Sequence, residues 1–487
     1  MRQAILIIPI LMVLLSCNLS KDPDEDLHNI SVTISNPADQ SVVDDSVLIE
    51  CEISHSEMIT KIELWVNNDS TGIYDLTYPF SIIWDTRDHE NGTYDVFIRS
   101  YDQVGTKFDS ETITINISNF LVYSKTYGSS QVNELGRSIM QINDSSFIIL
   151  GEYEDDILLM KSDRYGALEW QKSFGGSQLD VANHIEQTSD GGFIISATTE
   201  SYGQGGKDIW LFKTDASGLI QWNSYLGTPY NDNAGQVLET AEGGFMLIGG
   251  KGNSDEDSDM WLIKTNSQGD SLWTRSYGGS QSDVGHDILV DEQGGFVLLG
   301  STESQGNGGK DIWLFKIDEN GNEEWNHTYG NGSDDIGQSV VRTYDGGYMI
   351  RYAIKSYGSG NTAIGLLRLG QGRDEIWTRT IGGSTGIPGK SLQKTSEDEY
   401  VTSCSLFDNG NNSYDAYIIK INDSGDIIWD ANFGGTEDDK ARSLVQTFDG
   451  GYAITGSTKN YGNGTKLDSD VWLVKTDSIG FSRNFEE

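Results

Sequence analysis

Aspartates recur at two fixed places in this chain, and their carboxylates could bind a hard cation or organise loops. The first set follows each of a series of tryptophans by about ten residues: Asp180, Asp232, Asp283, Asp335 and Asp439. The second set precedes an apolar run that ends in lysine: Asp208, Asp259, Asp311, Asp415 and Asp470. A carboxylate in every unit is best explained by the unit itself, because it can accept backbone N–H groups and fix a loop. We therefore predict a structural role for both sets.

Calcium is the alternative for one of these loops, where Asp255, Asp257 and Asp259 crowd together. Calcium takes six to eight oxygen ligands, and this loop lacks a complete set. We accordingly expect no metal and no cofactor, with calcium as the alternative.

Catalytic residues do not form a recognisable constellation in the sequence. The 6 histidines, among them His184, His286 and His327, occupy unrelated positions in the repeat. Acidic residues are so abundant that any spacing of two carboxylates could arise by chance. The sequence favours a protein that is not an enzyme, and a hydrolase or lyase would need acids, Arg or His converging from several units.

Aromatic residues in variable loops are the candidates for ligand recognition. They are Tyr202, Tyr357, Phe407 and Tyr461, each set among Gly, Asn and Ser. Variable loops on a rigid framework are where binding residues concentrate. The alternative is that these aromatic rings only line turns.

The N-terminal segment has the features of an export signal. Arg2 precedes an apolar run from Ala4 to Leu15, which is too short for a stable membrane-spanning helix. The phrase Leu14-Leu15-Ser16-Cys17 resembles the lipobox of bacterial lipoproteins. This resemblance implies a signal peptide over residues 1–16, a lipid on the Cys17 sulfur and a chain anchored to the outer membrane. An ordinary secretory signal is the alternative.

An acidic tract follows the cysteine, and we expect residues 17–28 to act as a flexible tether. It resembles the export signal that sends some Bacteroidetes lipoproteins to the outer face of the cell. Display on the cell surface is therefore a further expectation, with a simple solvated linker as the alternative.

A unit of 51 or 52 residues must position these side chains. Its marker is a tryptophan in one local phrase: Trp170, Trp222, Trp273, Trp325, Trp377 and Trp429. Each unit holds four β-rich stretches divided by turns such as Asp190-Gly191-Gly192, which predicts four antiparallel strands. Such sheets suit stacking around an axis, with the tryptophans packed between them. A lysine also recurs, for example Lys213, and we assign it to edge strands, where it would discourage aggregation.

Seven copies of the unit can be counted, and the last lacks its fourth strand. The spare strand lies at residues 121–127, so we predict that it completes the last sheet and closes a ring. Two phrases of the unit resemble the SBBP-type repeats of bacterial β-propellers: Phe174-Gly175-Gly176-Ser177 and Asp311-Ile312-Trp313-Leu314-Phe315-Lys316. The spacing of the units is also similar to that of WD-repeats. The resemblance covers about residues 120–477 and implies a seven-bladed β-propeller over residues 120–487. The fifth copy departs from it, with Ala363 and Gly365 in place of Asp and Trp.

Residues 29–118 form a second module with alternating apolar runs. Three short segments of this module resemble bacterial Ig-like domains: Asn36-Pro37, Trp84-Asp85-Thr86 and Asn91 to Tyr94. This resemblance implies a small β-sandwich. Cys51 and Cys404 have no evident partners, so both are predicted to be buried apolar residues. The predicted fold class is all-β: an Ig-like sandwich followed by a propeller.

Charge excludes some partners, because 33 basic residues stand against 74 acidic ones and the net charge is −41. Such a polyanion is repelled by nucleic acid, whose binding needs Lys and Arg. The predicted function is a lipid-anchored envelope protein that displays a propeller for adhesion or for binding a protein or glycan. A scaffold subunit of an envelope complex is the first alternative, and a hydrolase or lyase is the second.

Overall fold

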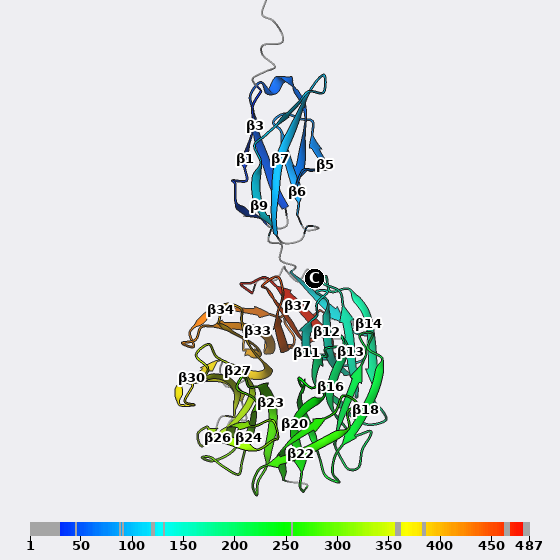
Figure 1. Ribbon diagram of the computed structural model, residues 1–487, viewed down its shortest axis with the longest axis vertical. Helices are drawn as coiled ribbons and strands as arrows, with labels where there is room; N and C mark the ends of the chain where they lie inside the picture. The colour runs from blue at the N-terminus through cyan, green and yellow to red at the C-terminus, as the bar shows by residue number, and fades with distance from the viewer. Residues whose placement is uncertain are drawn as a thin grey trace, which may run out of the picture. The chain divides into compact units, whose positions relative to one another are not determined.

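The computed structural model describes residues 30–43, 46–86, 89, 92–117, 122–129, 132–254, 257–355, 362–381, 386–461 and 468–480. These residues fall into two compact units, up to residue 120 and from residue 121 onward (Figure 1). Both units are built from strands, and the one helical turn in the described part is the 3-10 turn Ser56–Met58. Cys17 and the predicted signal peptide and tether lie outside the described residues.

The first unit is a sandwich of two sheets. One sheet has the order β1-β3-β6 and the other has the order β2-β9-β7-β4-β5, with β8 paired to β7. The strands are β1 (Val32–Asn36), β2 (Ser41–Val43), β3 (Ser46–Ile53), β4 (Ile59–Val66), β5 (Asp69–Asp75), β6 (Ser81–Asp85), β7 (Gly92–Asp102), β8 (Lys107–Asp109) and β9 (Ile113–Ile117). Alternate residues such as Ile49, Leu64 and Ile98 are buried between the sheets, and Cys51 packs against this core. The alternating apolar runs of residues 29–118 lie in β1, β3, β4, β6, β7 and β9, and the sequence did not predict the short or polar strands β2, β5 and β8.

The second unit contains seven four-stranded antiparallel sheets. Sheet 1 is β11 (Glu134–Gln141), β12 (Phe147–Tyr153), β13 (Asp156–Ser162) and β14 (Leu168–Phe174). Sheet 2 is β15 (Asp180–Gln187), β16 (Phe193–Thr199), β17 (Asp208–Thr214) and β18 (Ile220–Leu226). Sheet 3 is β19 (Asn233–Glu239), β20 (Phe245–Gly252), β21 (Ser258–Thr265) and β22 (Ser271–Tyr277). Sheet 4 is β23 (Asp283–Val290), β24 (Phe296–Thr302), β25 (Asp311–Ile317) and β26 (Glu323–Tyr329).

The remaining three sheets repeat this order with one change in the last. Sheet 5 is β27 (Asp334–Arg342), β28 (Tyr348–Lys355), β29 (Thr362–Leu369) and β30 (Glu375–Ile381). Sheet 6 is β31 (Gly386–Lys394), β32 (Tyr400–Asp408), β33 (Ser413–Ile421) and β34 (Ile427–Phe433). Sheet 7 is β35 (Asp439–Gln446), β36 (Tyr452–Thr458), β37 (Asp470–Thr476) and β10 (Tyr123–Tyr127). The first strand of this unit therefore pairs with its last, and Tyr123 lies opposite Lys475.

The seven sheets pack side by side around a common centre (Figure 1). The first strand of each sheet contacts the first strand of the next, and β35 of sheet 7 contacts β11 of sheet 1. We call β11, β15, β19, β23, β27, β31 and β35 the inner strands.

Tight turns between the first two strands of a sheet depend on glycine at a left-handed position. Gly191 and Gly243 have φ of 84° and 81°, which most L-residues adopt only at a cost. In the first of these turns Asp190 accepts the hydroxyl of Thr188 and the N–H of Gly192. These local bonds explain why Asp-Gly-Gly recurs at this place.

The repeated tryptophan joins neighbouring sheets. Trp222 of sheet 2 lies over Gly269 in the turn between β21 and β22 of sheet 3, where a Cβ would stand 2.3 Å from its ring. The same contact joins Trp170 to Gly218, Trp273 to Gly321, Trp377 to Gly425, Trp429 to Gly480 and, at the junction of sheets 7 and 1, Tyr123 to Gly166. In sheet 5 the turn carries Arg373 with φ of 69°, and its guanidinium lies 4.6 Å from the ring centre of Trp325. The prediction that the tryptophans pack between units thus has a specific geometry.

The repeated lysine is not on an edge strand, and that prediction was wrong. Lys213 lies on β17, which is flanked by β16 and β18, and its side chain is buried. Its Nζ lies 2.7 Å from Asp190 Oδ2, and this ion pair lowers the pKa of Asp190 to about 2. The lysine therefore ties the third strand to the Asp-Gly-Gly turn of its own sheet.

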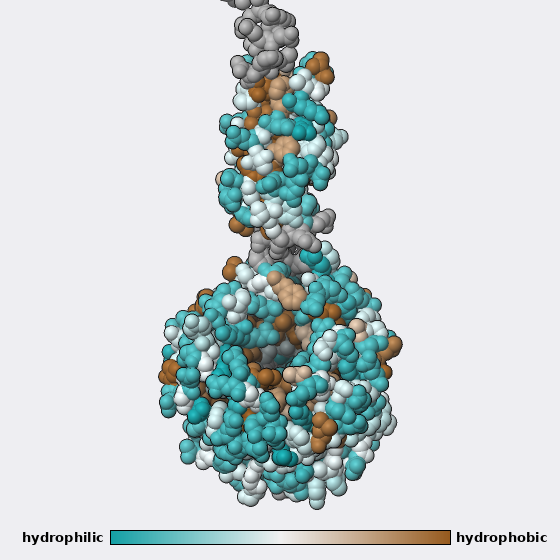
Figure 2. All heavy atoms as spheres, viewed as in Figure 1, coloured by the Kyte–Doolittle hydropathy of each residue, from teal (hydrophilic) through white to brown (hydrophobic). Residues whose placement is uncertain are grey.

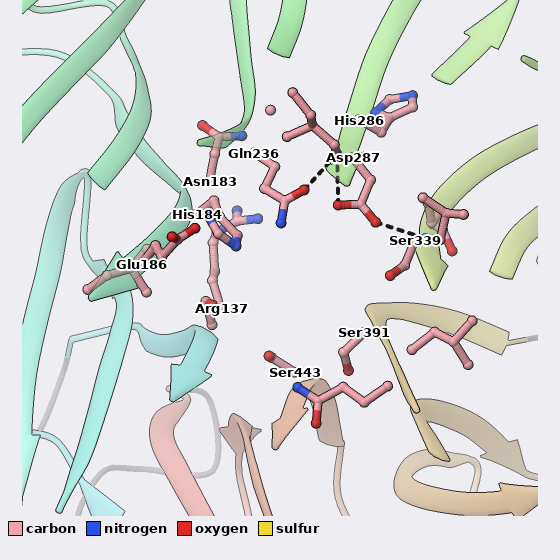
Figure 3. A pocket seen from close by; sticks show the side chains of 18 of the residues that line it. Arg137, Asn183, His184, Glu186, Gln236, His286, Asp287, Ser339, Ser391 and Ser443 are labelled. Atoms are coloured by element: carbon pink, nitrogen blue, oxygen red, sulfur yellow. Dashed lines mark hydrogen bonds between the residues drawn. The ribbon is translucent and has the colours of Figure 1, made fainter. Parts of the chain in front are cut away.

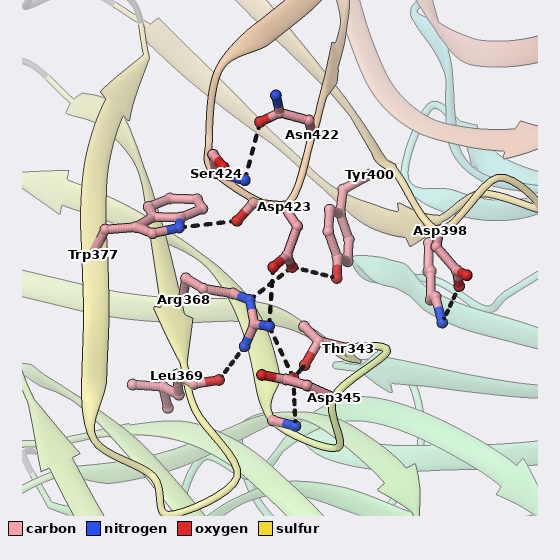
Figure 4. A network of polar contacts seen from close by, with 12 residues as sticks. Thr343, Asp345, Arg368, Leu369, Trp377, Asp398, Tyr400, Asn422, Asp423 and Ser424 are labelled. Atoms are coloured by element: carbon pink, nitrogen blue, oxygen red, sulfur yellow. Dashed lines mark hydrogen bonds and ion pairs between the residues drawn. The ribbon is translucent and has the colours of Figure 1, made fainter.

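In sheet 5 an arginine takes the place of that lysine and links two sheets (Figure 4). Arg368 of β29 lies 2.8 Å from Asp345 in its own sheet and 2.8 Å from Asp423 in sheet 6. Tyr400 donates its hydroxyl to the same Asp423 at 3.1 Å. The departure at Gly365 is also compensated, since the Tyr352 ring lies where a side chain at this position would stand.

Candidate functional site

A cavity of about 530 Å³ lies at the centre of the second unit, and all its described walls come from the inner strands. Figure 2 shows the hollow from one side of the molecule. Every inner strand contributes residues from its middle, so seven different parts of the sequence meet here.

A break in strand register aims polar side chains into this cavity. Pairing between the first two strands shifts at the same place in every sheet, for example between Gly136 and Ser138 and between Ala182 and His184. Such a bulge inserts one residue and turns two successive side chains toward one side of the strand. Two successive polar side chains of the strand can therefore face the cavity, whereas in a regular strand one of them would point to the opposite side.

Charged and polar groups converge on the cavity from three inner strands (Figure 3). Arg137 comes from β11, His184 and Glu186 from β15, and His286 and Asp287 from β23. These five are the ionisable residues among the described residues that line the cavity. Apolar residues such as Met140, Leu289, Val341 and Val445 complete the wall beside Gln393.

Side chains at one level of the cavity bind neighbouring inner strands together. Gln236 accepts the N–H of Ile288 at 2.7 Å, and Asp287 accepts the N–H of Val340 at 2.8 Å. In the same way Ser391 accepts the N–H of Leu444 at 3.1 Å. These bonds hold the wall rigid, which preorganises the groups that face the cavity.

Burial perturbs the ionisation of both acids in the wall. Burial raises the pKa of Glu186 to about 7, opposed by the N–H of Glu239 that it accepts and assisted by the charge of Glu239. Burial also raises the pKa of Asp287 to about 6, although the N–H groups of Val340 and Ile288 favour its carboxylate. Acids whose pKa values lie near neutrality in a cavity are candidates for proton transfer or for pH-dependent binding.

The aromatic residues predicted to bind ligand lie elsewhere and have structural contacts. Tyr202 donates its hydroxyl to the carbonyl of Gly175 at 2.7 Å and packs on Trp210 with ring centres 5.4 Å apart. Tyr461 does the same in sheet 7, with its hydroxyl 2.9 Å from the carbonyl of Gly434 and its ring stacked on Trp472.

Phe407 packs edge-to-face on Tyr414 at 5.1 Å, and Tyr357 lies outside the described residues. Each of the three predicted aromatic residues that the structure describes therefore has an intramolecular ring contact. Their role in binding stays a prediction, and Tyr202 and Tyr461 already stabilise their own loops.

The repeated aspartates accept backbone N–H groups within their loops. Asp180 accepts the N–H of Gly176 at 2.8 Å, and Asp283 accepts that of Gly279 at 2.9 Å. In the second set, Asp208 accepts the N–H of Gln204 at 2.9 Å, and Asp311 that of Asn307 at 2.7 Å.

The two sets also meet between neighbouring sheets. A Cβ at Gly330 would lie 2.1 Å from Asp311 Oδ1 and 3.1 Å from Asp335 Oδ2. Burial raises the pKa of both carboxyls, although the N–H that each accepts opposes this, and the charge of Asp311 adds to the rise at Asp335. In the described residues no group of three or more acidic, His or Cys side chains could hold a metal, and Asp255 lies outside them.

Comparison with known proteins supports the first unit directly. Residues 31–98 match the family of bacterial Ig domains, which confirms the predicted Ig-like module. A curated relative is the regulatory protein FlaEY of Caulobacter vibrioides, 25% identical over 178 residues. That match covers 31% of this chain and only 18% of the relative.

Solved structures similar to the second unit include propeller proteins. A catalytically inactive virginiamycin B lyase from Staphylococcus aureus with quinupristin has a TM-score of 0.47 and 12% identity, over 72% of this chain and 99% of the lyase. A puromycin hydrolase mutant has a TM-score of 0.46 and 11% identity, over 72% of this chain and 53% of the hydrolase. Neither carries an activity over to this chain. The described part of the chain contains no helix long and apolar enough to cross a membrane.

Sequence reasoning missed the cavity because its histidines fall at different offsets in the repeat. His286 is the extra residue at the bulge of β23, and His184 directly follows the bulge of β15. Both nevertheless line the cavity. A usable signal was the small residue directly before a polar pair, as in Ala182-Asn183-His184 and Gly285-His286-Asp287.

Proposed function

We propose that this chain is a ligand-binding module of the bacterial cell envelope and that its central cavity holds the ligand. The observation that carries this proposal is the convergence of Arg137, His184, Glu186, His286 and Asp287 on one cavity of about 530 Å³. Ligand sites are typically concave, mostly apolar and equipped with a few convergent polar groups.

The framework of the site is, in this proposal, a seven-bladed β-propeller closed by its N-terminal strand. The pairing of β10 with β37 supports closure, as does the contact of β35 with β11. The contact of Tyr123 with Gly166 repeats at this junction what tryptophan and glycine do between the other sheets. A closed ring leaves no unpaired sheet between its first and last units.

The cellular setting follows from the N-terminal residues. Lipidation of Cys17 would anchor the chain to the outer membrane, and in the sequence the Ig-like module follows the anchor and precedes the repeats. A scaffold subunit of an envelope complex has the same anchor, but it would use the outer surface of the ring instead of the cavity.

We propose a non-catalytic role, and acid-base catalysis is the second candidate. A specific observation favours this second candidate: a histidine, an arginine and two carboxylates converge from different sheets, as a hydrolase or lyase would require. Glu186, with a pKa of about 7, could exchange a proton near neutral pH. Product formation from any captured ligand would decide in favour of catalysis.

The experiment is a glycan-array and pull-down screen with the chain from residue 28, followed by variants. His184→Ala combined with His286→Ala should abolish capture, because both side chains line the cavity. Tyr344→Ala is the matched control, since Tyr344 is 81% exposed and is not one of the residues that line the cavity. Capture that survives the double variant but is lost with Tyr202→Ala and Tyr461→Ala would move the site to the aromatic loops and contradict the proposal.

A further inference from the structure

Three of the five ionisable residues that line the cavity are Arg or His, in a chain whose net charge is −41. Arg137, His184 and His286 line it. Arg442 precedes the lining residue Ser443 on β35, the inner strand that contacts β11. The residues in and beside the cavity are therefore richer in Arg and His than the acidic chain as a whole.

The acids near the cavity are already engaged. Glu152 of β12 forms an ion pair with Nε of Arg137. Asp287 accepts the N–H groups of Ile288 at 3.1 Å and Val340 at 2.8 Å. Glu186 accepts the N–H of Glu239 at 3.3 Å. The described lining residues of β11, β19, β27, β31 and β35 include no other acid.

Two guanidinium groups retain unused hydrogen-bond donors. The ion pair with Glu152 uses Nε of Arg137, and in the described part of the chain neither Nη of Arg137 donates a hydrogen bond. Arg442 has a buried Nε without a hydrogen-bond partner and forms no ion pair with any described residue. Burial, followed by the like charge of Arg137, lowers the pKa of Arg442, and the charge of Glu152 opposes this. One carboxylate, Glu152, thus stands against two guanidinium groups, and a bound anion would supply further negative charge and acceptors.

We propose that the cavity binds an oxyanion of its ligand, a carboxylate or a phosphate, through Arg137 together with His184 and His286. Arg442 adds positive charge from behind the wall. This inference rests on the proposed function and adds the chemical class of the ligand. Arginine suits this role because its planar group can hold a carboxylate or phosphate with two parallel hydrogen bonds.

The same groups give binding a pH dependence with a definite direction. Protonation of Glu186, whose pKa is about 7, removes a negative charge beside the anion as the pH falls. Protonation of an imidazole as the pH falls adds a positive charge, which also favours binding of an anion. Asp287, with a pKa of about 6, acts likewise at lower pH, whereas Arg137 stays charged throughout. Binding of an anion whose own charge is constant in this range, such as a carboxylate, should therefore strengthen between pH 8 and pH 5.5.

The test is calorimetric titration of the chain from residue 28 with three probes: inorganic phosphate, tri-galacturonate and neutral tri-galactose. Phosphate and tri-galacturonate separate the two sources of an oxyanion, and tri-galactose reports binding without charge. We expect at least one anionic probe to bind, at least tenfold tighter at pH 5.5 than at pH 8. Arg137→Gln should weaken it at least tenfold, and Glu186→Gln should flatten the pH dependence.

Arg275→Gln is the matched control, because Arg275 is exposed on the outer strand β22, and it should leave binding unchanged. If Arg137→Gln fails to fold, Arg442→Gln takes its place with an expected weakening of several-fold. Binding of tri-galactose that His184→Ala abolishes, without binding of either anion, would refute the anionic class and keep the proposed function. Failure of all three probes, or anion binding unchanged in both arginine variants, would overturn this inference.

Discussion

Replacing Gly269 by alanine tests how the sheets are joined, and the structure supplies a matched control in the same sheet. Gly269 and Gly243 have nearly equal φ, 80° and 81°. A Cβ at Gly269 would stand 2.3 Å from the Trp222 ring of the neighbouring sheet, whereas a Cβ at Gly243 meets no atom within 4 Å. The two substitutions therefore share the backbone cost and differ in the contact.

The expected magnitudes follow from that difference. A left-handed alanine costs about 1–2 kcal/mol, and the loss of freedom in the unfolded chain offsets about 0.4–1 kcal/mol of it. Gly243→Ala should therefore destabilise the unit by about 1 kcal/mol. Gly269→Ala adds the displacement of a packed ring, for which overpacking costs about 1–3 kcal/mol. We expect about 2 kcal/mol between the variants.

Urea denaturation monitored by far-ultraviolet circular dichroism measures both variants under identical conditions. A lower midpoint for Gly269→Ala with an unchanged slope is the expected result. Free energies of unfolding that agree to within about 0.5 kcal/mol would refute the idea that tryptophan and glycine hold neighbouring sheets together.

Three further predictions concern titration, closure and anchoring. Burial, then neighbouring carboxylates, raises the pKa of Asp415 to about 6, and burial raises that of Glu134 to about 7. The pKa values of these two carboxyl groups are higher in the folded than in the unfolded chain. Their contribution to the free energy of unfolding is therefore fully present below about pH 4 and is lost as the pH rises to 7. The melting temperature should thus fall between about pH 4 and 7. Asp415→Asn should reduce the accompanying loss of unfolding free energy by an amount on the order of 1 kcal/mol after screening. An unchanged profile would contradict the pairing of carboxylates. Lys125→Pro, in the middle of β10, should break the pairing of β10 with β37 and lower the free energy of unfolding by about 3 kcal/mol. Lys125→Thr is the control, because Lys125 is exposed and this change should cost under about 0.5 kcal/mol. Equal denaturation midpoints for the two variants would argue against closure. Cys17→Ala should abolish lipid labelling and detergent-phase partitioning, and partitioning that persists would count against the anchor.

The sequence predicted the framework because its signals are local. Turns such as Asp190-Gly191-Gly192 and the tryptophan spacing report a single unit, and the same unit recurs with each copy. The predicted ring-closing segment at residues 121–127 contains β10, which pairs with β37. The prediction for the repeated lysines was wrong because their partner cannot be read from the sequence. Lys213 lies close to Asp190 only once β17 folds back beside the turn that contains Asp190.

The candidate site could not be predicted in the same way because it depends on register. A bulge adds one residue to β15 and to β23, so His184 and His286 share the cavity although their positions in the repeat differ by one. Conversely, Tyr202 and Tyr461 looked variable but share a position, since each hydroxyl reaches a carbonyl 27 residues earlier. A shared offset was the sign of a structural role.

A crystal structure of the chain with its tightest-binding anion tests the central claim most directly. The account predicts electron density for that anion inside the central cavity, with its oxygens within hydrogen-bond distance of the Arg137 guanidinium and of His184 or His286. Density for the anion at the aromatic loops or on the outer strands, with the cavity holding water alone, would contradict it.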